Sequence, residues 1–275
     1  MTPTDSNHNS PPERDFELPR ILIDRLKEST LRVVIWGYIG ILYGMIFALV
    51  LGVLQPFLPP LPLYLIAGTL SSAVAALIYG SMRLTVIVAL FASIYSVIML
   101  VIAEGAINPL QMGFGALLCG AIVGAAFGRL AHHSRIGLAD AKAITGLVSG
   151  FIVSLLYVTL SLLTPLPLAS HWMVAVLCPV VGIIYTRLVP TFIRIFSKIL
   201  TPVGDGMLVA ITVSLLVTTG LWLMSTSINP DLAGDYLPLL LTIEEHLSLA
   251  VTAGMLSGMI GGFISTFVWR EWQEL

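Results

Sequence analysis

Charged residues are scarce in this chain. Only 10% of its 275 residues are Asp, Glu, Lys or Arg, whereas soluble domains carry about 25%. Instead, 57% of the residues are hydrophobic and the mean hydropathy is +0.98. This composition excludes an ordinary soluble domain and indicates no nucleic-acid partner. It predicts an integral membrane protein in contact with the lipid bilayer.

Cysteine is also scarce, which excludes a disulfide scaffold. The chain has two cysteines, Cys119 and Cys178, and both lie inside apolar runs. The acids and histidine of TIEEH (242–246), with His171 in another predicted outer loop, could be taken for metal ligands. Their spacing matches no metal signature. Thr242 and Glu245 instead fit a capping box at the start of a helix. We therefore expect no metal and no cofactor.

The sequence shows no arrangement of residues that is typical of catalysis. Ser149 and Ser257, each in a GxxSG context within an apolar run, have no histidine base nearby, so a nucleophile–base pair is missing. Asp205, in PVGDG, has only Asp140 as a companion, and we expect both at the cytoplasmic ends of their helices. The longest predicted loops have about 20 residues, which leaves no room for a soluble catalytic domain. We expect no catalytic residues and no enzymatic activity.

Long apolar runs predict eight transmembrane helices, because about 20 apolar residues suffice to cross a bilayer. The predicted spans are 33–54, 61–82, 84–103, 110–128, 143–163, 168–186, 207–228 and 247–268. With these spans, all 13 Lys and Arg residues fall on the side that holds both termini. The positive-inside rule assigns that side to the cytoplasm. We expect a bacterial inner membrane or an equivalent organelle membrane.

The fold that this pattern predicts is an all-α bundle of four like-oriented hairpins, which form an internal repeat. We expect a disordered tail at 1–18, an amphipathic cytoplasmic segment at 19–32 and a cytoplasmic end at 269–275. The membrane domain would cover 33–268, with halves at 33–128 and 143–268. A second basic amphipathic segment covers 190–200. Such segments lie along anionic membrane surfaces or dock to a membrane-protein partner.

Glycine is plentiful, with 24 residues, and it recurs at four-residue spacing within the apolar runs. This spacing places small residues along one stripe of a helix, where another helix can approach closely. The glycines to which we assign helix packing are Gly40, Gly44, Gly68, Gly80, Gly120, Gly124, Gly128, Gly146, Gly150, Gly254, Gly258 and Gly262. We expect GxxxG-type contacts on these stripes.

A few polar or helix-breaking residues within the spans are candidates for a solute path. They are Ser149, Ser154, Thr212, Thr218, Pro179 and Glu104. The hydroxyls could line such a path or could bond to carbonyls one turn earlier in their own helices. Glu104 could bind a cation at the outer side or could reach the headgroup layer.

Two functions of different class fit these observations. The first is a permease or channel for a small neutral or weakly polar solute, without a buried ion-coupling carboxylate. The second is a scaffold, assembly factor or accessory subunit of a larger membrane complex. Hydroxyl-bearing helices and Pro179 favour the first. Compact packing and the segments 19–32 and 190–200 favour the second.

Overall fold

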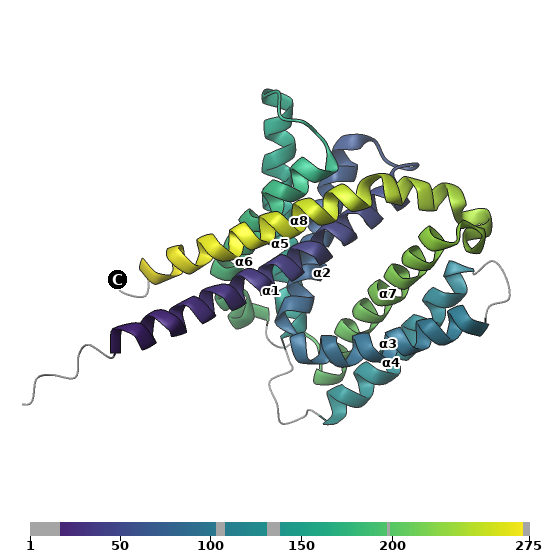
Figure 1. Ribbon diagram of the computed structural model, residues 1–275, viewed down its shortest axis with the longest axis horizontal. Helices are drawn as coiled ribbons and strands as arrows, with labels where there is room; N and C mark the ends of the chain where they lie inside the picture. Colours follow the sequence, from purple (N-terminus) through teal and green to yellow (C-terminus); the bar gives the residue numbers. More distant parts are fainter. Residues whose placement is uncertain (1–16, 103–107, 131–137, 197–198, 272–275) are drawn as a thin grey trace, which may run out of the picture.

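The computed structural model describes residues 17–102, 108–130, 138–196 and 199–271. Within these ranges the chain forms eight α-helices and one 3₁₀ helix (Figure 1). In chain order they are α1 (Glu17–Leu54), α2 (Pro60–Gly80), α3 (Met82–Ile102), α4 (Pro109–Leu130), α5 (Ala139–Leu163), α6 (Ser170–Phe196), α7 (Pro202–Ile228), η2 (Pro230–Tyr236) and α8 (Leu237–Glu271).

The predicted number of membrane spans is confirmed for the described part of the chain. Eight of its helices are long enough and apolar enough to cross a bilayer. Every one contains an 18-residue window with no more than two charged residues. The chain is therefore a multi-pass helical membrane protein.

The capping box predicted at Thr242 and Glu245 is wrong. Helix α8 begins at Leu237 rather than near residue 247, so Thr242 lies inside the helix. Its Oγ1 donates a hydrogen bond to the carbonyl of Pro238, 2.9 Å away. Pro238 lies in the first turn, where a proline needs no hydrogen-bond donor. This proline starts the helix within the stretch that we expected to be a loop.

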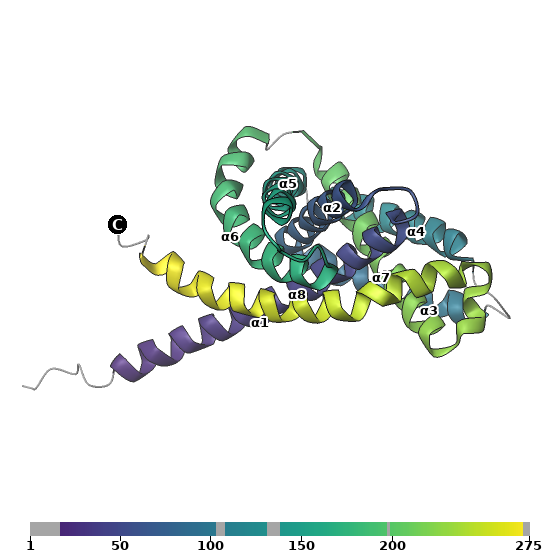
Figure 2. The same ribbon diagram turned by 90° about the horizontal axis from the view of Figure 1, so that it is seen from above.

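Two helices continue through segments that the sequence suggested were separate. Helix α1 is continuous from Glu17 and includes 19–32. Helix α6 continues through Pro190 to Phe196, and so includes the first part of 190–200. It follows a bent course around α5 (Figure 2). Pro179 and Pro190 both lie inside α6, and a proline within a helix removes one backbone hydrogen bond and allows such bending.

The helices pack in two groups. One contains α1, α2, α5, α6 and α8, and the other contains α3, α4 and α7. The most extensive contacts are α1 with α8, α4 with α7, and α2 with α5. Helices α1 and α8 lie side by side along the length of the molecule (Figures 1 and 2). Both predicted halves contribute helices to each group.

Glycines lie where the backbones of these three helix pairs approach each other. A Cβ on Gly44 of α1 would lie 2.9 Å from Val251 Cα of α8. A Cβ on Gly146 of α5 would lie 2.5 Å from the carbonyl oxygen of Ser72 in α2. A Cβ on Gly128 of α4 would lie 2.6 Å from the carbonyl oxygen of Pro202 in α7. Cβ atoms essentially never approach other atoms this closely, so each position excludes a side chain.

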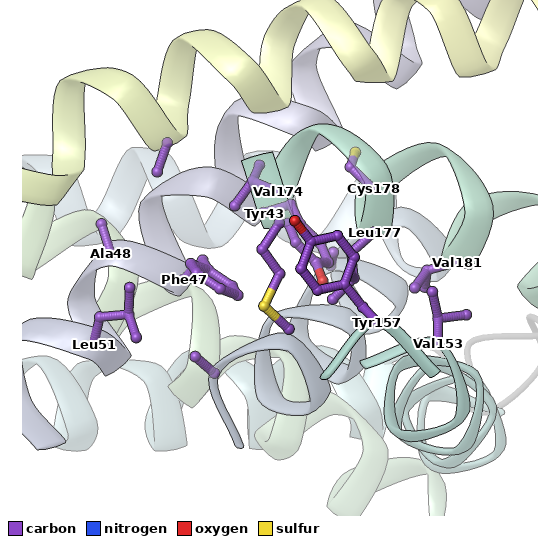
Figure 3. Packing of buried hydrophobic residues seen from close by; sticks show 14 of the residues in the cluster. Tyr43, Phe47, Ala48, Leu51, Val153, Tyr157, Val174, Leu177, Cys178 and Val181 are labelled. Carbon is purple, nitrogen blue, oxygen red and sulfur yellow. The ribbon is translucent and has the colours of Figure 1, made fainter. Parts of the chain in front are cut away.

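The largest apolar core lies between helices of the first group (Figure 3). Phe47 of α1 and Leu177 of α6 are fully buried there, and Tyr157 of α5 packs against the same core. Tyr43 and Cys178 belong to this core and also line the pocket described below.

Candidate functional site

The five predicted solute-path residues within the described ranges lie on α5, α6 and α7, and none of them lines the pocket described below. Ser149 of α5 donates to the carbonyl of Thr145 at 2.7 Å, and Thr212 of α7 donates to that of Leu208 at 2.8 Å. Thr218 accepts a hydrogen bond from Ser96 of α3 at 2.9 Å. These hydroxyls therefore bond within or between helices.

The other members of that set have different surroundings. Ser154 is fully buried, and its Oγ has no hydrogen-bond partner within the described ranges. A Cβ on Gly261 of α8 would lie 2.9 Å from Pro179 Cβ, so this proline packs on α8. Glu104 lies outside the described residues.

A pocket lies instead among α1, α2 and α6. The space within it is about 520 Å³, including the part that is open at its mouth. Its lining consists of Trp36, Ile39, Tyr43, Ser72, Ala75, Ala76, Tyr79, Cys178, Val181, Gly182, Tyr185 and Thr186. None of these twelve described residues is charged. Mainly apolar walls with a few polar groups are typical of small-molecule sites.

The inner end of the pocket is closed by a hydrogen-bonded cluster. The Tyr43 hydroxyl, on a side chain that is 2% exposed, donates to the carbonyl of Gly68 at 3.2 Å. Ser72 Oγ donates to the same carbonyl at 2.6 Å and lies 3.4 Å from the Tyr43 oxygen. Gly68 itself packs closely against α6, because a Cβ there would lie 2.6 Å from Leu177 Cδ2. The cluster joins α1 to α2 just beside the core.

Aromatic rings form the outer walls. The rings of Tyr79 in α2 and Tyr185 in α6 meet edge to face, with centroids 6.4 Å apart and an angle of 82° between planes. Tyr79 is 40% exposed and lies at the rim, whereas Tyr185 is 7% exposed. The Trp36 ring occupies the space that a Gly182 side chain would need, 2.6 Å from an added Cβ.

The hydroxyl groups of the lining divide into two sets. Those of Tyr43, Ser72 and Thr186 donate to backbone carbonyls. The hydroxyls of Tyr79 and Tyr185 make no hydrogen bond with any residue that the structure describes. Tyr79 can reach its surroundings at the rim. Tyr185 is more than nine-tenths buried, so a partner for its hydroxyl would have to come through the pocket.

Sequence reasoning missed this pocket. Tyr79 and Tyr185 each lie four residues or fewer before an arginine, Arg83 and Arg187. Tyrosines at such positions are typical of the aromatic belt at a membrane surface. Only the packing of α1 between α2 and α6 shows that these tyrosines share a cavity with Trp36 and Tyr43.

A second polar cluster joins the N-terminal ends of α5 and α7. Asp205 of α7 accepts hydrogen bonds from the backbone N–H groups of Leu138, at 3.0 Å, and Asp140, at 3.3 Å. In return, Asp140 of α5 accepts one from the N–H of Leu200, at 3.1 Å. Both carboxylates are buried. Leu138 is the N-cap of α5, with φ 110°, and has no side-chain acceptor of its own.

This exchange explains why two aspartates are buried together. The first turn of a helix has unpaired N–H groups, which an acceptor must satisfy. Here the start of α5 receives an acceptor from the first turn of α7, and the residue just before the α7 N-cap receives one from α5. Lys142 contributes in the same region, since its Nζ donates to the carbonyl of Gly80 at the end of α2, at 2.6 Å. We interpret the cluster as a structural joint between helix ends.

The acidic and histidine side chains that suggested a metal site bond elsewhere. His246 Nε2 lies 3.2 Å from Gln55 Oε1, and Glu244 accepts a hydrogen bond from Ser227. The ring of His171 packs beside Trp172, with centroids 5.8 Å apart. Among the described residues, no three potential ligands gather into a metal-binding group.

The eight apolar helices thus define the class of this protein as multi-pass integral membrane. Comparison with known proteins adds no closer assignment, since no family, no curated protein and no solved structure matches the chain. The pocket is therefore the feature of this protein that bears on its function.

Proposed function

We propose that this protein is a permease for a small neutral or weakly polar solute, which binds in the pocket among α1, α2 and α6. The observation that carries this proposal is a pocket among α1, α2 and α6 with an uncharged, aromatic-rich lining inside a helical membrane protein. Ligand sites in such folds lie between helices. We further propose that the protein has no enzymatic activity.

The course of α6 supports movement of one pocket wall. Four lining residues, Val181, Gly182, Tyr185 and Thr186, lie between Pro179 and Pro190. A helix segment between two prolines can change its angle at both ends, because each proline removes a backbone hydrogen bond. The Tyr43 cluster closes the other end. The pocket therefore has one closed end and one adjustable side, as alternating access requires.

The uncharged lining supports a neutral solute. Burying an ionised group in an apolar site is costly unless an opposite charge or several hydrogen bonds compensate. The buried carboxylates of Asp140 and Asp205 are not part of the lining, and they accept backbone hydrogen bonds. We therefore propose that transport is facilitative and uses no buried ion-coupling carboxylate.

Uptake into proteoliposomes tests the permease proposal. The probes would be radiolabelled uridine, phenyl β-glucoside and glycerol, which are uncharged and cross a bare bilayer slowly. We expect the wild-type protein to accelerate uptake of at least one probe. Ala75→Phe should abolish that acceleration, because Ala75 lines the pocket. Ala126→Phe adds the same bulk on an exposed part of α4 and should leave uptake unchanged. Uptake equal to that of empty liposomes for all probes would contradict transport.

The second candidate function is that of an accessory subunit of a membrane complex. Helix α1 begins at Glu17, whereas its candidate span begins at Ser29. The first turns of α1 project away from the other helices (Figure 1). A partner bound there or at 190–200 would co-purify from native membranes at fixed stoichiometry. Recovery of the protein alone would contradict this function.

A further inference from the structure

We infer that the pocket binds an uncharged, planar ring compound that carries one hydrogen-bonding group, and that this group pairs with the Tyr185 hydroxyl. The inference rests on the proposed function, because it names the class of solute that the pocket would take. It depends on three observations about the walls of the pocket.

The first observation is the aromatic character of the walls. Trp36, Tyr43, Tyr79 and Tyr185 contribute rings to a single cavity. Aromatic rings favour offset-stacked or edge-to-face partners, and such pairs contribute beyond simple burial of apolar area. Tyr79 and Tyr185 already adopt an edge-to-face pair with each other. A flat ring can extend this set of contacts, whereas a flexible acyl chain gains nothing from ring geometry.

The second observation is the unpaired Tyr185 hydroxyl. Its side chain is 7% exposed and lines the pocket, yet the hydroxyl bonds to no described residue. A tyrosine whose ring is largely buried normally finds a partner for its hydroxyl. The other buried hydroxyls of the lining, those of Tyr43 and Ser72, are already used on the Gly68 carbonyl. Tyr185 is thus the buried group that can orient a ligand.

The third observation is the lack of charge among the twelve lining residues. A carboxylate or ammonium group on the ligand would lose its hydration without gaining a counter-ion there. The same ring with a neutral hydroxyl should bind, and with a carboxylate it should not. This contrast separates the inferred class from charged aromatic compounds of the same shape.

The test is equilibrium dialysis of three matched probes against the full chain in phosphatidylcholine nanodiscs. The probes are naphthalene, 2-naphthol and 2-naphthoate, which share a ring system and differ in the head group. Specific binding is the wild-type signal minus that of Ala75→Phe, so that partition into lipid cancels. Val181→Phe fills the pocket from α6 and replaces Ala75→Phe should that variant not fold. We expect 2-naphthol to bind most tightly, naphthalene more weakly and 2-naphthoate not at all.

Tyr185→Phe isolates the hydrogen bond. Loss of one such bond should lower the affinity for 2-naphthol about five- to tenfold and leave the affinity for naphthalene unchanged. Tyr38→Phe is the matched control, since Tyr38 is exposed on α1 outside the pocket lining. No specific binding of 2-naphthol, as expected for a pocket filled by lipid chains, would overturn the inference. Equal losses for both probes in Tyr185→Phe would overturn the assigned role of the hydroxyl.

The binding and uptake measurements can fail separately. Specific 2-naphthol binding without uptake of any transport probe would leave the ligand class standing and contradict the permease proposal. Uptake that Ala75→Phe blocks, with no preference for 2-naphthol over naphthalene or 2-naphthoate, would support transport and overturn the ligand class.

Discussion

At the scale of single residues, the most informative side chains are those that accept hydrogen bonds from the backbone N–H groups of another helix. Asp205 is the example, because its carboxylate supplies the acceptor that the N-cap Leu138 lacks. The same carboxylate accepts the N–H of Asp140, one residue into α5. One side chain therefore connects the start of α5 to the start of α7.

We predict that Asp205→Ala lowers the free energy of unfolding by about 1–3 kcal/mol, since it leaves buried N–H groups unpaired. Asp205→Asn keeps one acceptor oxygen and should lose less. The measurement is the apparent melting temperature in detergent, read from the monodisperse fraction that survives heating. Asp231→Ala is the control, because Asp231 is exposed. Equal melting temperatures for Asp205→Ala and Asp231→Ala would contradict the role of Asp205 in stabilising the joint between α5 and α7.

The sequence indicated that Asp205 lies near the start of a helix, but not what it binds there. Its partner Leu138 is a leucine, a residue type that signals no cap and that occupies a positive φ only at a cost. The same limit applies to Tyr185. Its position beside Arg187 predicts a place near the membrane surface, whereas its unpaired hydroxyl becomes visible only once α2 and α1 are placed around it.

At the scale of helices, close approach of backbones characterises the contact between α1 and α8. Gly40 and Gly44 of α1 lie against the backbone at Gly254 and Ala250 of α8. In a membrane, helices gain little from apolar burial against each other, so that close packing has a larger share in their association. A single added methyl group on this surface must therefore separate the two backbones.

We predict that Gly44→Ala destabilises the protein by about 1–3 kcal/mol, as overpacking of a well-packed contact does. Its Cβ would lie 2.6 Å from the carbonyl carbon of Ala250. Gly220→Ala in α7 is the matched control, because the nearest neighbour of its Cβ would be Met45 Sδ at 3.8 Å, an ordinary van der Waals distance. Thermal melts of both variants in the same detergent check the prediction. A melting temperature of Gly44→Ala at or above that of Gly220→Ala would show that α8 can move away from α1 without a loss of stability.

The number of helices could be predicted from the sequence because each span is a long apolar run, whereas several boundaries could not. Helix α8 begins ten residues earlier than the predicted span at 247, since Pro238 allows a helix to start within an apolar loop. Helix α6 likewise continues beyond the predicted end of its span at 186, through Pro190 to Phe196. In both places proline is compatible with a helix, either in its first turn or at a bend.

At the scale of the whole molecule, the orientation in the membrane follows from charge and stays a prediction. All 13 basic residues of the sequence fall on one side of the eight-span arrangement. The positive-inside rule then places both termini in the cytoplasm. Two exposed positions at opposite predicted sides allow a direct measurement: Phe57, between α1 and α2, and Leu130, at the end of α4.

We predict that an impermeant maleimide labels Phe57→Cys in intact cells and labels Leu130→Cys only after the membrane is opened. The background would carry Cys119→Ser and Cys178→Ser, which removes both natural thiols. The unsubstituted background controls for non-specific labelling. Labelling of Leu130→Cys, but not of Phe57→Cys, in intact cells would contradict the predicted orientation.

The pairing of the first helix with the last has a consequence for how the chain is made. A ribosome must synthesise everything from residue 55 to residue 236 after α1 before α8 begins, which takes roughly 10–40 s at about 5–20 residues per second. Throughout that time the surface of α1 that carries Gly40 and Gly44 is not covered by α8. In a chain that ends before α8, the glycine-bearing surface of α1 therefore stays uncovered. A membrane protease or insertase can recognise such an exposed surface.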